Sequence, residues 1–215
     1  MYRASRGLYR SLLLPLLRFR AQGTEHIPPS GGVILASNHQ SYLDPIVVGC
    51  ASPRVPVHFM ARESLFRSRI LAFYFRHTHT FGVRRGGADR EAWGHFESLV
   101  RSGETVSFFP EGTRSVDGRL GRAHPGSGML IHRCAGATVI PTRIRGTYRV
   151  LNRDRGLVGL GPVSIAFGPP VDLSAHWARP GGREIYQDLA DKVMEAVAAV
   201  PAIRDRDDDR EALTR

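Results

Sequence analysis

Cysteine is nearly absent from this chain, which has only Cys50 and Cys134 among its 215 residues. Each lies alone in a largely apolar stretch, and this pattern argues against a disulfide framework and against a cysteine-based metal site. Isolated thiols of this kind are typical of a reducing compartment, so we expect the cytoplasm. The histidines are scattered as well, and we expect no metal ion or other cofactor.

Long hydrophobic runs are also missing. The apolar stretch from Leu12 to Leu17 is followed at once by Arg18 and Arg20, and no small-residue cleavage site comes after it. Spanning a bilayer takes about 20 apolar residues, so this stretch predicts neither a membrane span nor a secretory signal.

The same stretch has the pattern of a basic amphipathic helix kinked at Pro15. One side of the helical wheel carries Leu8, Leu12, Leu16 and Phe19, and the other carries Arg3, Arg6 and Arg10. This separation favours a helix at residues 1–22 that lies in the membrane interface. The alternative is a helix whose leucines dock on the core of the protein itself.

Acidic residues and lysine are scarce. The chain has 30 basic residues against 20 acidic ones, a net charge of +10, and Lys192 as its only lysine. So basic a chain favours polyanions, namely nucleic acid, an anionic membrane surface or phosphorylated substrates. No nucleic-acid-binding motif or basic-aromatic stripe occurs, so we expect no nucleic-acid partner.

What the chain does contain is an alternation of strand-like and helix-like segments. We predict strands at residues 33–36, 57–61, 80–83, 105–109, 138–144 and 163–167, and helices at 63–75, 89–101, 126–134 and 183–200. This alternation predicts an α/β domain at residues 23–200, a layered sandwich with a largely parallel sheet flanked by helices. Residues 201–215 are charged and are expected to form a mobile tail.

The first chemical signal, Asn38-His39-Gln40-Ser41-Tyr42-Leu43-Asp44, follows the strand at 33–36. Residues five apart on a helix lie about 140° round its axis, so His39 and Asp44 can meet only if the chain turns between them. Pro45 favours such a turn, because it fits the first helical position with Asp44 as N-cap. In that loop a carboxylate could hold one nitrogen of an imidazole while the other reaches a substrate. The alternative is a helix cap beside a bystander histidine.

The second signal, Phe109-Pro110-Glu111-Gly112-Thr113-Arg114-Ser115, follows the strand at 105–109. Glu111, Thr113 and Arg114 therefore lie at a strand end, where α/β sheets usually place their ligands. The alternative is an ordinary polar loop with a solvated arginine and a surface ion pair.

Together the two motifs resemble the first and third signatures of the 1-acylglycerol-3-phosphate acyltransferases and related lysophospholipid acyltransferases. Residues 81–86 and 139–142 are similar to the second and fourth signatures, and all four stand in the family's order. The resemblance runs from about Gly23 to Val200. Many members read Met-Ala-Lys-x-Glu-Leu where residues 60–65 here read Met-Ala-Arg-Glu-Ser-Leu. A substrate contact by Arg62 therefore stays open, because arginine keeps the charge of lysine but not its geometry.

The resemblance implies transfer of a fatty acyl group from acyl-CoA or acyl carrier protein to the free hydroxyl of lysophosphatidic acid, giving phosphatidic acid. The thioester donor, a co-substrate, is already activated, so the enzyme must mainly make the hydroxyl nucleophilic. His39 is the candidate general base, and Asp44 would orient its ring and stabilise the imidazolium. A covalent route through Ser41 is not needed.

The resemblance also implies substrate-binding residues, namely Arg84, Arg85, Glu111, Gly112, Thr113 and Arg114. Arg114 and one of Arg84 or Arg85 would bind the phosphate of the acceptor through their planar guanidinium groups. Glu111 would position Arg114 or the loop backbone. Gly112 would let the backbone approach closely, and Thr113 would donate a hydroxyl hydrogen bond.

Two other functions fit the same residues. One is acyl transfer to another acceptor, such as glycerol 3-phosphate, a lyso-aminolipid or a glycolipid. The other is a peripheral protein that binds lipid phosphates without turnover, although such binding needs no pair of base and carboxylate. In each case we expect a peripheral or monotopic protein on the cytoplasmic face of the membrane. Its expected partners are an anionic membrane surface, a lysophospholipid and the acyl donor.

Overall fold

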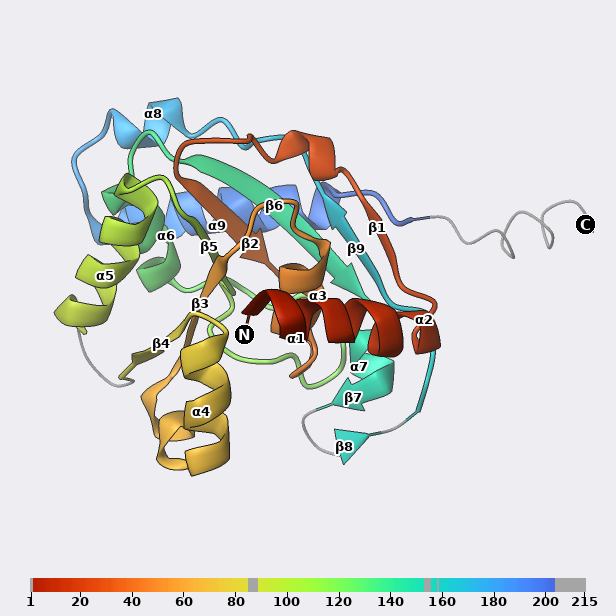
Figure 1. Ribbon diagram of the computed structural model, residues 1–215. Coiled ribbons are helices and arrows are strands. Elements are labelled where there is room, and N and C mark those ends of the chain that lie inside the picture. Colours follow the sequence, from red (N-terminus) through yellow and green to blue (C-terminus); the bar gives the residue numbers. More distant parts are fainter. Residues whose placement is uncertain (1, 85–88, 153–155, 158, 204–215) are drawn as a thin grey trace, which may run out of the picture.

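A seven-stranded sheet forms the centre of the computed structural model, which describes residues 2–84, 89–152, 156–157 and 159–203 (Figure 1). The strand order is β1-β9-β6-β2-β5-β3-β4, and every neighbouring pair is parallel except β6 with β9. The strands are β1 (Arg20–Gln22), β2 (Val33–Ser37), β3 (Val57–Arg62), β4 (Thr80–Val83), β5 (Thr105–Phe108), β6 (Thr138–Arg145) and β9 (Ser164–Phe167). The predicted α/β sandwich with a largely parallel sheet is confirmed. Most of the predicted tail, residues 204–215, lies outside the described residues.

The central strand β2 is buried on both faces. Val33 and Leu35 pack into the core on one side of the sheet, and Ile34 and Ala36 pack into the core on the other. Successive side chains of a strand point to opposite faces, so a strand covered on both sides needs an apolar residue at every position. This is why residues 33–36 form an unbroken apolar run.

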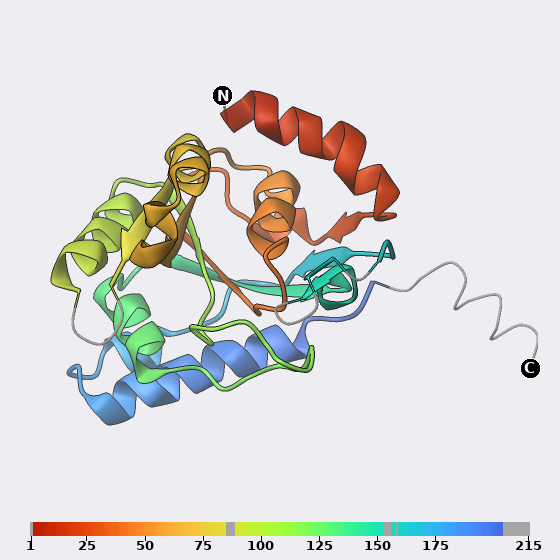
Figure 2. The ribbon, with the colours of Figure 1, turned by 90° about the horizontal axis from the view of Figure 1, so that it is seen from below.

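Helices cover both faces of the sheet (Figure 2). On one face lie α3 (Asp44–Ala51) and the N-terminal helical segment, which share a core cluster through Val47, Val48 and Leu17. On the other face lie α5 (Arg90–Arg101), α6 (Pro125–Arg133) and α9 (Arg183–Ala199). The sequence did not predict the short elements, which carry too little periodicity. These are a 3₁₀ turn (Thr24–His26), α7 (Thr147–Val150), the hairpin of β7 (Leu151–Asn152) and β8 (Gly156–Leu157), α8 (Ser174–Trp177), and β1.

The single helix predicted at residues 63–75 was wrong. The chain forms a 3₁₀ turn (Glu63–Arg67) and then α4 (Arg69–His77). Between them Ser68 has an extended backbone, with φ −73° and ψ 121°. Serine is a weak helix former because its hydroxyl competes for backbone groups, and the apolar pattern hid this break.

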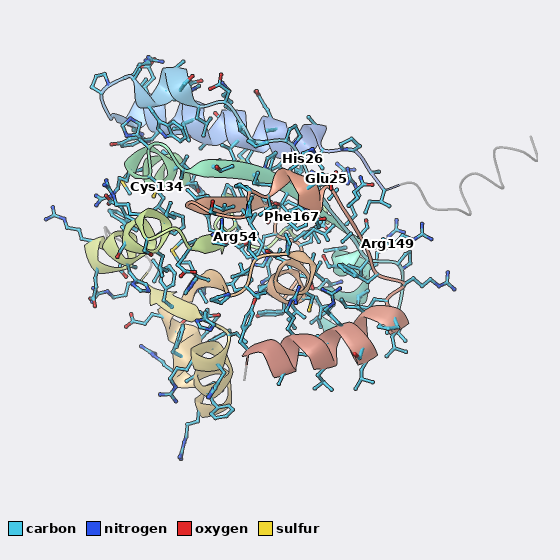
Figure 3. All side chains as sticks on the ribbon, turned by 45° about the horizontal axis from the view of Figure 1, so that its top comes forward. Glu25, His26, Arg54, Cys134, Arg149 and Phe167 are labelled. Carbon is cyan, nitrogen blue, oxygen red and sulfur yellow. The ribbon has the colours of Figure 1, made fainter. Side chains whose placement is uncertain are left out.

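Arg54, one of the side chains labelled in Figure 3, joins the loops at the amino ends of three neighbouring strands. It precedes β3, and its guanidinium donates to the carbonyls of Pro28 (3.2 Å) and Gly31 (2.7 Å) before β2. It also donates to the carbonyl of Gly103 before β5. The amino ends of β2, β3 and β5 are thus held together, and the two loops that carry the sequence motifs leave β2 and β5 at the opposite end of the sheet.

The N-terminal segment is helical, as α1 (Tyr2–Leu8), a π-helical turn (Tyr9–Leu13) and α2 (Leu14–Leu16). Its outer side carries Leu8, Leu12 and Leu16, which are 56%, 61% and 61% exposed. Phe19, predicted on the same side, instead packs against the core next to the fully buried Leu17. Among the described residues, no helix is long and apolar enough to cross a membrane.

The basic side of this segment faces the protein. Arg6 donates to the carbonyls of Gly49 (3.0 Å), Cys50 (3.2 Å) and Ser52 (2.9 Å), and Arg10 donates to that of Cys50 (3.1 Å). These are the unpaired carbonyls at the C-terminal end of α3, where the helix dipole favours cations. The segment is therefore attached to the domain by its arginines and inner leucines, and a stripe of three leucines stays outside.

Close packing of α6 on α9 depends on Gly128, where a Cβ atom would lie 1.8 Å from the carbonyl oxygen of Tyr186. Gly128→Ala should lower the free energy of unfolding by about 1–3 kcal/mol, the usual cost of overpacking. The melting temperature should fall by about 2–4 °C per kcal/mol. Gly126→Ala in the same helix is the control, because its Cβ would meet nothing within 4 Å. Equal melting temperatures for the two variants would contradict this account of the packing.

Candidate active site

The two sequence motifs meet at the carboxyl end of the sheet. β2 and β5 are parallel neighbours with Ala36 opposite Phe108, so the loops that follow them begin side by side. The backbone N–H of His39 donates to Glu111 (2.9 Å), and that of Ser115 donates to the carbonyl of His39 (2.8 Å). This is the end at which parallel α/β sheets bind ligands.

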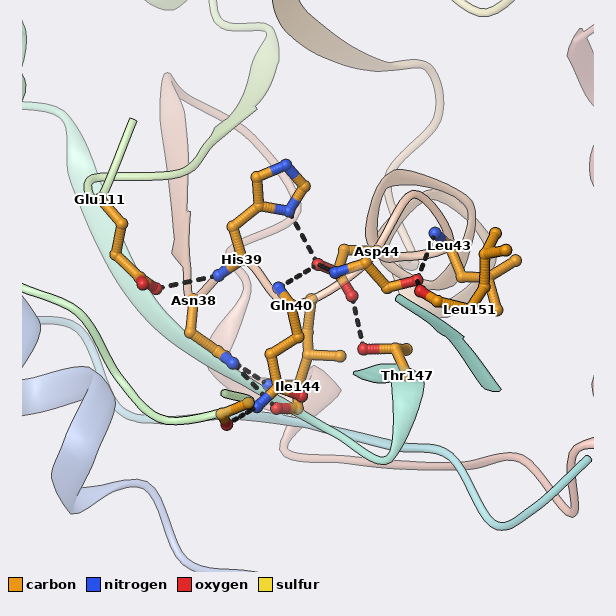
Figure 4. A network of polar contacts seen from close by, with 11 residues as sticks. Asn38, His39, Gln40, Leu43, Asp44, Glu111, Ile144, Thr147 and Leu151 are labelled. Carbon is orange, nitrogen blue, oxygen red and sulfur yellow. Dashed lines mark hydrogen bonds and ion pairs between the residues drawn. The ribbon is translucent and has the colours of Figure 1, made fainter. Parts of the chain in front are cut away.

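Asn38 fixes the start of the first loop. Its side-chain amide donates to the carbonyl of Ile144 (3.0 Å) and accepts from the N–H of the same residue (2.7 Å), as Figure 4 shows. The side chain thus continues the hydrogen bonding of β2 to β6 beyond the last backbone pair. Asn38 is buried, and these bonds satisfy both of its polar atoms.

Asp44 is the centre of a buried hydrogen-bond network (Figure 4). Its Oδ2 accepts from His39 Nδ1 (2.8 Å), the N–H of Gln40 (2.6 Å) and the N–H of Ser41 (2.7 Å), and its Oδ1 accepts from the hydroxyl of Thr147 (2.7 Å). These bonds offset the loss of water around a fully buried carboxylate. The predicted turn that brings His39 and Asp44 together is confirmed.

The predicted N-cap role of Asp44 was wrong. Asp44 is the first residue of α3, and Leu43 stands at the cap position without a side-chain hydrogen bond. The carboxylate turns back to the loop, because the donors of three loop residues and of Thr147 converge there. Pro45 does lie in the first turn of the helix, as predicted.

The ring of His39 is held on two sides. Asp44 accepts from Nδ1, and Phe109 stacks on the ring with centroids 3.9 Å apart and planes inclined by 14°. A proton on Nδ1 leaves Nε2 as the acceptor nitrogen of the neutral ring. Within the described ranges no protein group bonds to Nε2, and the side chain, 18% exposed, lines a cavity.

Glu111 bridges the two halves of the site. It is 3% exposed, and its two oxygens accept from the N–H groups of His39 and Gly121, each at 2.9 Å. Burial raises the pKa of the Glu111 carboxyl, and the two backbone hydrogen bonds oppose this shift. Two roles were expected for Glu111, positioning Arg114 or positioning the loop backbone, and its hydrogen bonds are to the loop backbone.

Arg114 lies over the ring of Tyr42, with its guanidinium carbon 3.5 Å from the ring centroid. Its Nη1 is buried and has no hydrogen-bond partner in the described part of the chain. Tyr42 thus orients the cation through its ring face and leaves N–H groups free. Arg114 lines the same cavity as His39, together with Thr113 and Gly112, whose φ of +64° suits glycine.

Arg84 also lines the cavity, but it already has a partner. Its Nε lies 3.5 Å from Asp89, the N-cap of α5, and the side chain is 63% exposed. Hydrogen bonds from the backbone N–H groups of Arg84 and Ala92 lower the pKa of Asp89, and the Arg84 side chain adds to this shift. Arg85 lies outside the described residues, so the choice between the two arginines stays a prediction.

The cavity has a volume of about 620 Å³. Much of its wall is apolar and comes from Pro45, Ile46, Phe59, Met60, Leu65, Phe75, Val83, Phe108 and Phe109. Among the described residues, the lining includes four arginines (Arg6, Arg62, Arg84 and Arg114) and no acidic side chain. Tyr2 and Tyr9 complete the wall, so the N-terminal segment, predicted as a separate unit, forms part of this site.

The sequence analysis missed two contributors to the site, Tyr42 and α7. Thr147 at the start of α7 bonds to Asp44, and the hydroxyl of Tyr148 donates to the carbonyl of Val116 (2.7 Å) in the loop that carries Arg114. Thr147 lies 103 residues from Asp44, and its short helix carries no periodic signal. Only the glycine before it, Gly146 with φ +88°, marks a turn there.

Known proteins are similar to this chain in sequence and in fold. A chloroplastic 1-acyl-sn-glycerol-3-phosphate acyltransferase of Brassica napus is 28% identical over 163 residues, covering 74% of this chain and 46% of that protein. The 1-acyl-sn-glycerol-3-phosphate acyltransferase of Bacillus subtilis is 26% identical over 148 residues, covering 68% and 70%. The chain spans about half the length of the plant relatives.

The fold matches the crystal structure of PlsC, the 1-acyl-sn-glycerophosphate acyltransferase of Thermotoga maritima, with a TM-score of 0.71. The match covers 93% of this chain and 80% of that one at 23% identity, and it supports the fold alone. The model of the Acyltransferase family matches residues 18–145, more than half of the chain. That range holds His39, Asp44, Glu111 and Arg114, while Thr147 of α7 and the lining residues of the N-terminal segment lie outside it. Because the family model covers more than half of the chain, the chain belongs to the acyltransferase family.

Proposed function

We propose that this chain transfers a fatty acyl group from acyl-CoA or acyl carrier protein to the free hydroxyl of 1-acylglycerol 3-phosphate, giving phosphatidic acid. One observation carries the proposal. Asp44 holds one nitrogen of His39 at 2.8 Å, and the ring lines an arginine-bearing, largely apolar cavity. The names of the similar proteins from Brassica napus and Bacillus subtilis support the same acceptor.

In the proposed reaction, Nε2 of His39 removes the proton of the acceptor hydroxyl while that oxygen attacks the thioester carbonyl. A C–O bond forms and the C–S bond breaks, and the proton then passes from His39 to the leaving thiolate. Asp44 stabilises the imidazolium that exists between these steps. Ser41 is not the nucleophile, because its hydroxyl is buried and donates to the carbonyl of Leu151 (2.5 Å).

The charges of the cavity favour a phosphorylated acceptor. In the part of the chain that the structure describes, the lining includes arginines and no acidic residue, and Arg114 has a buried Nη1 without a hydrogen-bond partner. A guanidinium in this state suits the oxygens of a phosphate, whereas the neutral head of a glycolipid would leave its positive charge without a counterion. The apolar wall suits the fatty chains of the donor and the acceptor.

We further propose that the protein meets its lipid at the cytoplasmic face of a membrane, as a peripheral or monotopic protein. Leu8, Leu12 and Leu16 point outward on the segment that also forms a wall of the cavity. Each leucine buried in the interface would contribute about 1.5–3 kcal/mol before ordering costs. An acceptor in the bilayer would then reach the cavity without passing through water.

The function is tested by replacing the base. His39→Ala should lower kcat by about 10²–10⁴-fold, the usual contribution of a general base, without a change in fold. The assay supplies acyl-CoA or acyl carrier protein and a panel of lysolipids, and mass spectrometry identifies the product. His95→Ala, at an exposed position on α5 and outside the cavity lining, is the control and should keep its rate. Near wild-type turnover by the His39 variant would refute the mechanism.

The bond from Thr147 to Asp44 should matter for turnover more than for substrate binding. Thr147→Val removes the hydroxyl at constant shape, and we expect kcat to fall about 10-fold, or about 1.4 kcal/mol, with KM nearly unchanged. Thr147→Ser keeps the donor and should keep most of the rate. If serine failed to restore kcat at an unchanged melting temperature, the hydroxyl would not act through Asp44.

Arg114→Ala should raise KM for a phosphorylated acceptor, since loss of a charged hydrogen bond costs about 1.5–3 kcal/mol. The matched control is Arg119→Ala in the same loop, where the side chain is 88% exposed. The measurement compares kcat/KM for lysophosphatidic acid with that for the phosphate-free monoacylglycerol. Equal losses on both acceptors would mean that Arg114 holds the loop instead of binding phosphate.

A further inference from the structure

A second hollow, of about 530 Å³, lies between the N-terminal segment and the end of α3. Its lining includes Arg6, Arg10 and Arg18 and the apolar side chains of Leu14 and Phe19, and none of the described residues in it is acidic. We call it the arginine groove. Apart from Arg6 and Cys50, its lining residues do not line the cavity that holds His39.

The positive charge of the arginine groove is not neutralised. Arg6 and Arg10 both donate to the same oxygen, the carbonyl of Cys50, at 3.2 and 3.1 Å, so their guanidinium groups lie close together. Among the described residues no carboxylate pairs with Arg6, Arg10 or Arg18. The dipole of α3 offsets part of this charge. A bound anion would remove the remaining repulsion.

The guanidinium groups keep donors for such an anion. The Arg10 side chain uses only one Nη1 contact, and both Arg10 and Arg18 are exposed, with no further side-chain hydrogen bond among the described residues. Planar guanidinium groups bind phosphate oxygens through paired N–H donors. The groove therefore has a charge and a geometry that suit a phosphate group.

We propose that the arginine groove binds the phosphate of an anionic membrane phospholipid, at a place separate from the cavity that holds His39. The outward leucines Leu8, Leu12 and Leu16 on the same segment favour a lipid over a free anion, because they bring the groove to the level of the headgroups. Leu14 and Phe19 offer apolar contact to the part of the lipid below its phosphate. The proposal goes beyond acyl transfer and does not depend on it.

The test measures binding of the full chain to vesicles of phosphatidylcholine, with and without phosphatidylglycerol. Arg10→Gln and Arg18→Gln should each lower the partition coefficient on phosphatidylglycerol vesicles about 5-fold, or about 1 kcal/mol, and leave binding to pure phosphatidylcholine unchanged. The Arg18 side chain makes no hydrogen bond or ion pair with a described residue, so its replacement should not loosen the segment. Wild-type binding by Arg18→Gln would overturn the proposal.

Two matched variants separate a site from diffuse attraction. Arg183→Gln removes an equally exposed charge from α9 on the other side of the sheet (Figure 2), and it should change binding by less than about 2-fold. Arg10→Lys keeps the charge but loses the planar fork, and it should bind nearly as weakly as Arg10→Gln. An equal loss from Arg183→Gln, or full binding by Arg10→Lys, would mean that no site exists.

Inorganic phosphate is the second probe. If it stabilised the wild type against heat but not Arg10→Gln, while vesicle binding did not respond to either variant, the groove would bind free phosphate and the lipid proposal would fail. Turnover of a soluble short-chain acceptor should stay unchanged in Arg18→Gln, since Arg18 does not line the cavity around His39 and its side chain does not attach the segment to α3. Failure of this proposal is thus distinct from failure of the proposed acyl transfer.

Discussion

The buried charge of Asp44 is the constraint on which the site depends. A carboxylate without water must be met by donors, and here the N–H groups of Gln40 and Ser41, the ring of His39 and the hydroxyl of Thr147 meet it. The loop after β2 has to fold back to supply three of these donors. The position of His39 is therefore a consequence of satisfying Asp44.

A second buried carboxylate acts on the same histidine from the other side. Glu111 binds the backbone N–H of His39, whereas Asp44 binds its ring, so backbone and side chain are fixed by different loops. Asp44 follows β2 and Glu111 follows β5, and these two strands are neighbours in the sheet. The sheet thus sets the distance between the two anions, and they set the orientation of the imidazole.

Sequence reasoning succeeded where the signal is local. The apolar run of residues 33–36 identified β2. The spacing of His39, Asp44 and Pro45 identified the turn that follows and the contact between His39 and Asp44 at its two ends. It failed where an interaction joins distant segments, as with Thr147 on Asp44, because no spacing encodes such a contact. Sequence reasoning also gave Asp44 the wrong hydrogen-bond donors. Aspartate is common at helix N-caps, but here the donors of the loop after β2 and of Thr147 bind the carboxylate instead.

Composition was a poor guide to what each arginine does. Net charge predicted an affinity for anions, yet Arg54 and Arg6 bind backbone carbonyls, and Arg101 and Arg133 pair with Glu97. A guanidinium that closes loop ends or a helix terminus acts as a structural donor. The arginines that remain for ligands can be identified only once these internal partners are known.

The N-terminal segment has two faces with different surroundings. Tyr2 and Tyr9 form part of the cavity wall, and Leu8, Leu12 and Leu16 point away from it. If the leucines enter a bilayer, the depth at which they sit and the lateral pressure of the lipid act on the same helix that bounds the cavity. The shape of the cavity would then depend on both the protein and the membrane in which the leucines lie. Enzyme in detergent micelles would accept a different range of acyl chains from enzyme on a bilayer.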